Sequence, residues 1–287
     1  MRMVAFLSSA TSTGPPGAYW HPGDVVWGIY QNTVFDAGRG VRLWEEEGEL
    51  VGFALLEEPD GVVMQVHPRL RGSGSLEEEM LGWAEGQTRE VYGERAGDEL
   101  WTRVAEDDPR LDALLVGLGF GRDPDHALKM VRTLDGPLPD HAPSDGWTVR
   151  EVGGEGEWEE RVEVHREVWH PSRVTLEAYR RLRAAPAYDP RLDLVAVAPD
   201  GRFGSYCICW FDPQSRTGLF EPLGTRQAYR GKGLGKAVMQ EGLRRLRELG
   251  AQTALVTAVH DNEAARSLYE SVGFETVNRE RLYGKKR

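Results

Sequence analysis

The sequence predicts a mixed α/β protein of two domains in tandem, each with a β-rich sheet flanked by helices. Its length of 287 residues suits two domains of ordinary size or one large domain. Residues 133–146 contain three prolines and few apolar side chains, which is typical of an interdomain linker. The segments on either side repeat one order of strand, glycine-containing turn, helix, strand and helix. We therefore expect a duplicated domain rather than a solenoid of short repeats.

The repeat sets the expected domain boundaries. Arg71 and Arg230 open the two turns and stand 159 positions apart, while Phe120 and Phe274 follow the two last helices and stand 154 apart. These offsets place the first domain at residues 1–135, the linker at 136–146 and the second domain at 147–287.

The first domain shows its elements only in outline. A strand is expected to end at residues 65–68, just before the turn at 71–74. A helix then runs through Trp83, a strand passes residues 100–102, and a second helix ends at residues 118–120.

The second domain can be predicted in more detail. Its apolar patterns predict strands at residues 147–152, 192–198, 205–211, 219–225 and around Val256, and helices at 157–168 and 175–183. A longer helix starts near Gly235, because apolar residues recur every three or four positions as far as Leu249. Gly250 is the expected end of that helix.

Charge and cysteine content narrow the class of protein. The formal net charge of -11 argues against nucleic acid or an anionic membrane as a partner and weakly favours an amine-bearing one. The two cysteines, Cys207 and Cys209, lie too close on one strand for an unstrained disulfide. Without a disulfide framework or a metal-type Cys/His spacing, we expect a metal-free protein of a reducing cytoplasm. No stretch is apolar for long enough to span a membrane.

Residues 230–236 read Arg-Gly-Lys-Gly-Leu-Gly-Lys, between a predicted strand and a predicted helix. Glycines let a backbone approach a ligand closely, and the first turn of a helix carries unpaired N–H groups at the positive end of its dipole. Such a turn can hold a pyrophosphate, and Arg230, Lys232 and Lys236 add positive charge. Since it lacks the ending of a P-loop and the position of a Rossmann turn, the motif alone fits a structural turn equally well.

A second motif favours a phosphate site over a structural turn. Asn262, Ala265 and Tyr269 are spaced to share one face of a short helix, which Asp261 or Asn262 can cap. Taken alone, Tyr269 would be an ordinary half-buried aromatic residue. The series Arg-x-x-Gly-x-Gly, strand, Asn-x-x-Ala-x-x-Leu-Tyr and Gly-Phe is improbable by chance, however, and therefore favours a functional site.

Together the two motifs resemble the GNAT superfamily of acyl-CoA-dependent N-acetyltransferases, over most of residues 147–287 and weakly over 3–132. The two-domain layout resembles that of mycothiol synthase-like members. The resemblance implies a mostly antiparallel mixed sheet in each domain, whose fourth and fifth strands splay apart to admit the pantetheine of acetyl-CoA. Pro222 suits the splay, because a residue without an N–H leaves a ladder bond unmade where strands part.

The resemblance also implies a site for acetyl-CoA as co-substrate. Backbone groups of Leu223, Gly224 and Thr225 would contact the pantetheine. The pyrophosphate would lie in the turn formed by Arg230, Gly231, Lys232, Gly233, Leu234, Gly235 and Lys236. Asn262 and Ala265 would border the CoA arm.

For catalysis, the resemblance implies Tyr269 as the general acid that protonates the leaving thiolate, while a backbone N–H at the splay stabilises the oxyanion. Glu221, on the strand before the turn, is the candidate base for the acceptor amine, directly or through water. A strand-edge carboxylate with a cationic neighbour is an equally good interpretation of Glu221. His165, Trp169 and His170 are candidate substrate contacts, although most such histidines are surface residues.

The first domain departs from the family pattern. Leu76 replaces the last glycine of the turn, and Glu77, Glu78 and Glu79 would repel a pyrophosphate. Asp108 and Leu115 stand where the asparagine and the tyrosine are expected. We therefore expect a first domain that keeps the fold, has lost catalysis, has an impaired CoA site, and either shapes or covers the acceptor pocket of the second.

The sequence thus predicts an acetyl-CoA-dependent N-acetyltransferase that acts on a small-molecule amine through its second domain. Two alternatives stay open: a non-catalytic acyl-CoA-binding or sensing protein, and an acetyltransferase acting on a protein lysine or N-terminus. A monomer and a homodimer are both compatible with the sequence.

Overall fold

The computed structural model describes residues 2–57, 59–71, 74–138 and 146–286. The part before residue 139, called the first half below, contains helices α1 (Arg2–Thr13), α2 (Pro22–Tyr30), α3 (Ala37–Gly40), α4 (Ser75–Tyr92) and α5 (Pro109–Gly117). Its strands are β1 (Val41–Glu46), β2 (Glu49–Glu57), β3 (Gly61–Val66), β4 (Glu99–Ala105) and β5 (Gly121–Thr133). Helices α1 to α3, which precede the first strand, were not predicted from the sequence.

The part from residue 146 onward, called the second half, repeats this plan. Its helices are α6 (Trp158–Val168), α7 (Leu176–Arg183), α8 (Leu234–Glu248) and α9 (Glu263–Ser271). Its strands are β6 (Thr148–Glu151), β7 (Asp193–Val197), β8 (Phe203–Asp212), β9 (Thr217–Thr225), β10 (Thr253–Val259) and β11 (Glu275–Lys286). The predicted helices and strands of this half are therefore all present. Most of the predicted linker, residues 139–145, lies outside the described residues.

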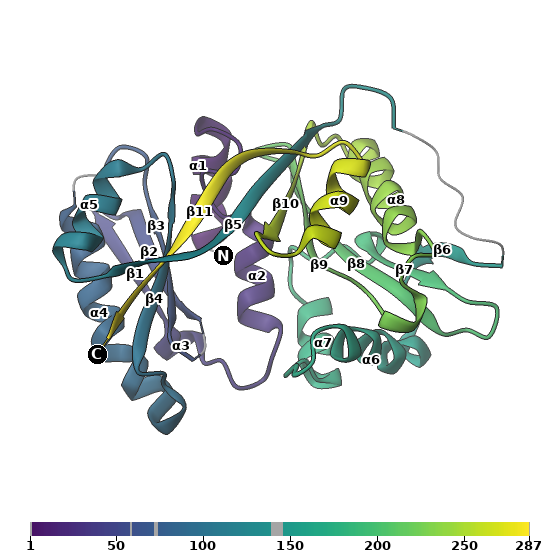
Figure 1. Ribbon diagram of the computed structural model, residues 1–287, viewed down its shortest axis with the longest axis horizontal. Coiled ribbons are helices and arrows are strands. Elements are labelled where there is room, and N and C mark those ends of the chain that lie inside the picture. Colours follow the sequence, from purple (N-terminus) through teal and green to yellow (C-terminus); the bar gives the residue numbers. More distant parts are fainter. Residues whose placement is uncertain (1, 58, 72–73, 139–145, 287) are drawn as a thin grey trace.

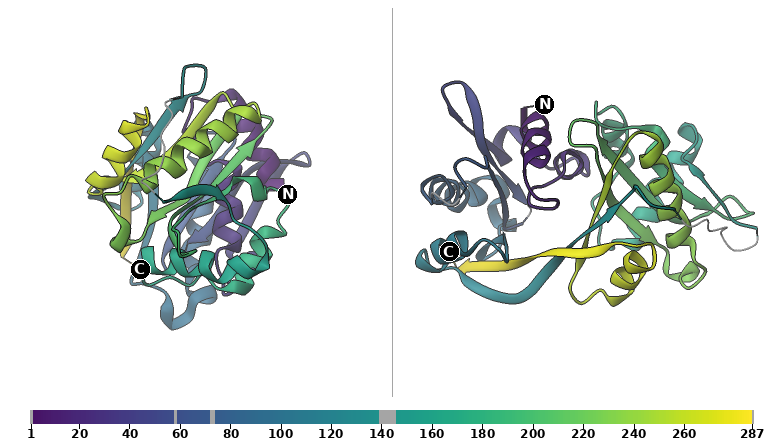
Figure 2. Two further views of the ribbon diagram at one scale, coloured as in Figure 1. Left: turned by 90° about the vertical axis from the view of Figure 1, so that its right-hand side faces the viewer. Right: turned by 90° about the horizontal axis from the view of Figure 1, so that it is seen from above.

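In the described chain one sheet of 11 strands joins the two halves, in the order β1-β2-β3-β4-β11-β5-β10-β9-β8-β7-β6. The last strand of the first half, β5, pairs antiparallel with β10 of the second half. The last strand of the second half, β11, pairs antiparallel with β4 of the first half, and it also pairs with β5. Figures 1 and 2 show these two strands running together from one half to the other. Each half therefore completes its sheet with the final strand of the other.

The mixed, mostly antiparallel sheet and its splayed strands are confirmed. Strands β9 and β10 are parallel neighbours that pair only where residues 253–255 face 217–219, and beyond this point they part. In the first half, β3 and β4 pair only where residues 61–62 face 101–102. Both halves thus keep an opening between two parallel strands.

Helices cover both faces of the second half's sheet (Figure 1). Helix α8 buries its apolar stripe, including Val238, Leu243 and Leu246, on one face together with Cys207 and Cys209. A Cβ on Gly242 would lie 2.6 Å from the Phe220 ring, so this glycine lets the helix approach the sheet closely. The predicted helix stop is also confirmed, because Gly250 has a φ of 98°.

Helix α2 of the first half packs on the opposite face, against the second half. Val26 and Trp27 join a core cluster with Trp210 of β8 and Leu182 of α7. A Cβ on Gly23 would lie 2.3 Å from the Trp210 ring, so the start of α2 rests directly on β8. The two cysteines are free, with their sulfurs 3.9 Å apart, as their spacing predicts.

Candidate active site

The glycine-rich turn leads from β9 into α8. Gly231 and Gly233 have φ values of 78° and 72°, in the left-handed region that favours glycine. Helix α8 begins at Leu234 without a side-chain hydrogen bond at its cap. Its first N–H groups are therefore available to an anion, and the turn has the local geometry of a phosphate site.

A cavity of about 430 Å³ lies between this turn, β9 and α9. We call it the donor cavity. Its lining includes every residue predicted for acetyl-CoA except Lys232: Leu223, Gly224, Thr225, Arg230, Gly231, Gly233, Leu234, Gly235, Lys236, Asn262 and Ala265. Lys232 instead extends along the turn, with its Nζ 5.5 Å from the centre of the Tyr229 ring. The structure thus brings together residues that are up to 42 positions apart in the sequence.

Gly235 and Asn262 line the donor cavity at the starts of its two helices. A Cβ on Gly235 would lie 3.2 Å from both Leu268 and Thr225, so a larger residue would crowd the start of α8 against α9. Asn262 caps α9, since its Oδ1 accepts a hydrogen bond from the Ala265 N–H at 3.0 Å. Contact between Asn262 and CoA stays a prediction.

Tyr269 lines the donor cavity from α9 and is 7% exposed. Burial, and then the nearby Glu221 carboxylate and Cys207, raise the pKa of its phenol above the ordinary value. The hydroxyl therefore keeps its proton at neutral pH and can act as a proton donor.

Glu221 lies at an irregularity of β9. Cys207 faces Leu223 and Cys209 faces Phe220, so Glu221 and Pro222 together oppose only Ile208. This bulge changes the direction of the strand next to the splay. The Trp210 indole N–H donates to the Glu221 carbonyl at 2.6 Å and holds the bulge in place. Burial and the neighbouring Asp24 carboxylate raise the pKa of the Glu221 side chain to about 8.

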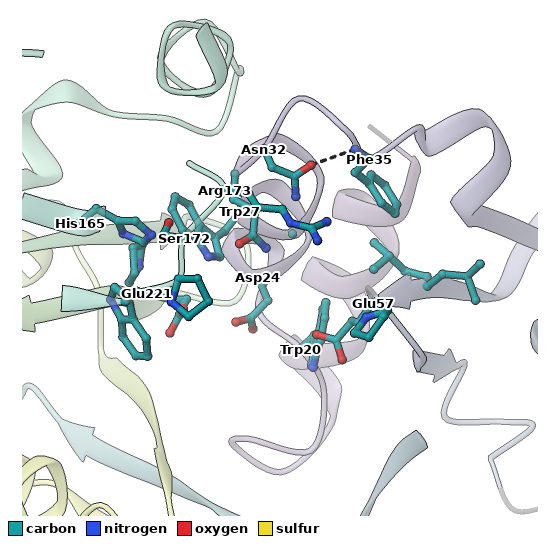
Figure 3. Close-up of a pocket in the computed structure, with 18 residues that line it drawn as sticks. Trp20, Asp24, Trp27, Asn32, Phe35, Glu57, His165, Ser172, Arg173 and Glu221 are labelled. Carbon is teal, nitrogen blue, oxygen red and sulfur yellow. Dashed lines mark hydrogen bonds between the residues drawn. The ribbon is translucent and has the colours of Figure 1, made fainter. Parts of the chain in front are cut away.

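Glu221 also lines a second cavity, of about 650 Å³, which lies between the halves and which we call the acceptor cavity (Figure 3). The first half contributes Trp20, Asp24, Trp27, Gly28, Gln31, Asn32, Phe35, Leu55, Leu56, Glu57 and Pro59. The second half contributes His165, Trp169, Pro171, Ser172, Arg173, Glu221 and Pro222. Because Trp169 lines both cavities, the donor and acceptor cavities adjoin at this side chain.

The three predicted substrate contacts have different surroundings. His165 is buried, and its Nδ1 lies 2.7 Å from the Tyr206 hydroxyl. Burial and then the Arg161 cation lower its pKa to about 3, so His165 is neutral and serves the cavity wall. The Trp169 indole N–H donates to the same hydroxyl at 2.7 Å. His170 lines a separate groove beside α6 and is absent from the acceptor cavity.

Asp24 and Glu57 are acidic residues of the acceptor cavity that the sequence analysis missed. Asp24 lies in the first turn of α2, where the sequence His21-Pro22-Gly23-Asp24 is a helix-start signal that could have located it. Glu57 ends β2, and nothing in its local sequence indicates that this strand faces the second half.

In the first half, described side chains at the corresponding place contact one another. Arg71 lies 3.2 Å from Asp108, which also caps α5 by accepting from the Leu111 N–H. The Arg71 guanidinium also lies over the Tyr19 ring, at 5.4 Å. Leu115 is fully buried. Gly72 and Ser73 of the predicted turn lie outside the described residues.

A helix start that can bind phosphate, a splayed strand pair and a tyrosine beside a carboxylate define an acyltransferase that takes its acyl group from coenzyme A. Comparison with known proteins agrees with this class. The model of the acetyltransferase (GNAT) family matches residues 157–274. The mycothiol acetyltransferase of Streptomyces coelicolor is 32% identical over 248 residues, which cover 82% of this chain and 76% of that protein. The mycothiol acetyltransferase of Kineococcus radiotolerans is 33% identical over 248 residues, covering 80% and 76%.

Solved structures share the fold over nearly the whole chain. A GCN5-related N-acetyltransferase from Sphaerobacter thermophilus has a TM-score of 0.72 at 21% identity, covering 99% of this chain and 91% of that one. The tandem GNAT protein from the clavulanic acid biosynthesis pathway, without AcCoA, has a TM-score of 0.68 at 16% identity, covering 99% and 94%. The chain belongs to the GNAT family and is an acetyl-CoA-dependent N-acetyltransferase. No helix in the described ranges is long and apolar enough to cross a membrane.

Proposed function

We propose that this protein transfers the acetyl group of acetyl-CoA to the amine of a small molecule bound between its two halves. The observation that carries the proposal is the junction of the two cavities, where Glu221 lines the acceptor side and Tyr269 the donor side. The Glu221 carboxylate raises the pKa of Tyr269, which agrees with their closeness. An acid and a base on opposite sides of one reacting centre suit direct acyl transfer.

Acetyl-CoA supplies a thioester whose carbonyl carbon an amine can attack. The N–H groups at the start of α8 and the side chains of Arg230 and Lys236 are the groups that would bind its pyrophosphate. The residues of β9 next to the splay, Leu223 to Thr225, would hold the pantetheine by their backbone groups. The donor cavity thus offers positive charge for the pyrophosphate and strand backbone for the pantetheine.

In the proposed reaction the amine nitrogen forms a bond to the carbonyl carbon, and the carbon–sulfur bond breaks. Glu221 accepts the proton that the amine loses, and Tyr269 gives a proton to the departing sulfur. A carboxylate with a pKa near 8 is a stronger base than an ordinary glutamate, which suits proton removal from an ammonium group. The second half would therefore carry the chemistry, while the first half forms the opposite wall of the acceptor cavity.

A small-molecule acceptor is favoured over a protein acceptor because both halves line the cavity, which has a volume of about 650 Å³. The relatives named mycothiol acetyltransferase support the same class of acceptor and make mycothiol-related amines reasonable candidates to test. A non-catalytic sensor would need neither Glu221 nor Tyr269 beside the donor cavity.

The first experiment is a calorimetric titration of the full chain with acetyl-CoA, followed by an amine screen that measures release of the CoA thiol. We expect one binding site per chain and thiol release that depends on an amine. Two sites would mean that the first half also binds the donor. Binding without thiol release for any amine would favour a sensor, and the absence of binding would overturn the proposal.

A further inference from the structure

We propose that the acceptor carries a second cationic group, which stays charged during the reaction and binds to Asp24 in the acceptor cavity. The inference deepens the proposed function and rests on it. Its basis is the position of a fixed carboxylate from the first half opposite the candidate base Glu221 of the second half (Figure 3).

Asp24 is held rigidly where it lines the cavity. One carboxylate oxygen, Oδ2, accepts the His21 N–H at 2.7 Å, which closes the N-terminal capping box of α2. His21 in turn places its Nε2 3.2 Å from the Thr217 carbonyl of β9. Its Nδ1 accepts from the Gly23 N–H at 3.0 Å, so Nε2 carries the proton and donates to Thr217. The helix start that carries Asp24 is thus anchored to the strand that carries Glu221.

The negative charge of Asp24 is not neutralised by an ion pair. In the part of the chain that the structure describes, no basic side chain lies within ion-pair distance of this carboxylate, and Oδ1 makes no hydrogen bond. The nearby Lys129 is bound to Glu280 at 3.3 Å and to the Thr257 hydroxyl at 3.3 Å. Glu57, further along the cavity, is paired with Arg103 at 3.0 Å. Asp24 is therefore the carboxylate best placed to receive a cation from a ligand.

The walls around Asp24 also favour a cation. Trp20, Trp27 and Phe35 line the same cavity. An ammonium group over an aromatic face is stabilised by the ring quadrupole, and most strongly when water is excluded. Arg173 also lines the cavity but is not paired with Asp24. The Asp24 carboxylate, with aromatic rings in the same cavity, thus favours an alkylammonium group.

Glu221 and Asp24, two of the three described carboxylates of the acceptor cavity, suit two different amine states. The reacting amine must lose its proton before it attacks, so its charge disappears during the reaction, and Glu221 serves that group. A second ammonium group keeps its charge throughout and needs a partner of its own. Figure 3 places Asp24 between Glu221 and Glu57, so an elongated diamine can reach Asp24 when its other end lies at Glu221. The volume of about 650 Å³ accommodates such a molecule.

The test compares α,ω-diamines of four to ten carbons with amino alcohols of the same length, as acceptors for the full chain with acetyl-CoA. The two series differ only in the charge of the remote group. We expect kcat/KM to be at least tenfold higher for the diamine than for the amino alcohol at one optimal length. Equal values at every length would overturn the inference and leave the proposed function intact. Transfer to none of these amines, nor to any amine in the screen, would overturn both.

The variant Asp24→Asn removes the charge and keeps an oxygen that can accept the His21 N–H. We expect it to abolish the diamine preference, measured as the ratio of kcat/KM for the diamine to kcat/KM for the amino alcohol. The ratio is the readout because loss of the Asp24 charge also lowers the pKa of Glu221, which affects both series alike. Glu57→Gln should lower the preference less, because Arg103 already neutralises Glu57. Asp98→Asn, at an exposed position outside both cavities, is the matched control and should keep the preference. An unchanged preference in Asp24→Asn would contradict the inference.

Discussion

The two halves of this protein repeat one plan of strands and helices but differ at the point where a coenzyme would bind. In the second half the turn after β9 faces a cavity of about 430 Å³. In the first half Arg71 reaches across the equivalent place to Asp108 and Tyr19. The splay between two parallel strands is present in both halves. The two halves therefore share the splay and differ in the described side chains at the turn.

Three paired positions differ between the two turns and the helices that follow them. Leu76 stands in place of Gly235, and its side chain packs close to Gly52 of β2. Glu77 stands in place of Lys236 and is buried at the start of α4. Lys236, at the equivalent position of α8, lines the donor cavity. Leu115 replaces Tyr269 and has no proton to donate. Size, charge and chemistry have each changed at one position of the first half.

The largest effect is expected from removing the carboxylate of Glu221 on β9. Strand β3, its counterpart in the first half, carries no carboxylate. In Glu221→Gln we expect kcat/KM to fall about 10³-fold, because the acceptor amine loses its base, while the affinity for acetyl-CoA stays constant. In the unsubstituted protein, activity should rise with pH and level off above about 8, because Glu221 must be ionised to accept a proton. A pH–rate profile that keeps its shape in the variant would assign the base to another group.

A second test gives the second half an apolar side chain in place of the tyrosine hydroxyl, as Leu115 does in the first. Tyr269→Phe should lower kcat about 10²-fold, because the departing thiolate must then take its proton from water. Binding of acetyl-CoA, measured by calorimetry, should change little, since the ring still fills the same buried space. The control is Tyr229→Phe, which alters a tyrosine of the turn. Equal kcat values for Tyr269→Phe and the unsubstituted protein would exclude Tyr269 as the acid.

A third test transfers the charge of the first half to the second. In Lys236→Glu we expect the affinity for acetyl-CoA to fall about tenfold or more, because a charge-assisted contact with the pyrophosphate becomes a repulsion. The loss should shrink at high salt. Lys286→Glu, near the C-terminus, makes the same change of charge away from the cavity and should bind normally. Equal losses in the two variants would point to overall charge rather than to a pyrophosphate contact.

The smallest effect is expected in the first half itself. Arg71→Ala breaks the partly exposed ion pair with Asp108 and should lower the free energy of unfolding by about 1 kcal/mol. The kcat/KM should stay within about twofold, because this turn is proposed to be non-catalytic. Urea unfolding and thiol release would measure both quantities. A large loss of activity with unchanged stability would show that the first half takes part in the reaction.

Local motifs were predictable from the sequence because neighbouring residues create them. The turn at 230–236 and the helix that carries Asn262 and Tyr269 have the predicted conformation, and the fold class is confirmed. The partners of β5 and β11 were not predictable, since an apolar strand does not encode which neighbour it pairs with. Asp24 reaches the acceptor cavity through the packing of α2 on β8, and Glu57 reaches it at the end of β2. Both positions could only be found in three dimensions.

The exchange of final strands has the geometry of a domain-swapped dimer contained within one polypeptide. A domain-swapped dimer of separate chains dissociates when the protein is diluted. Here both halves belong to one polypeptide, so the pairing of β5 and β11 with the other half is intramolecular and is set by an effective concentration rather than by the amount of protein. An acceptor cavity lined by two halves thus stays assembled at any concentration at which the enzyme works.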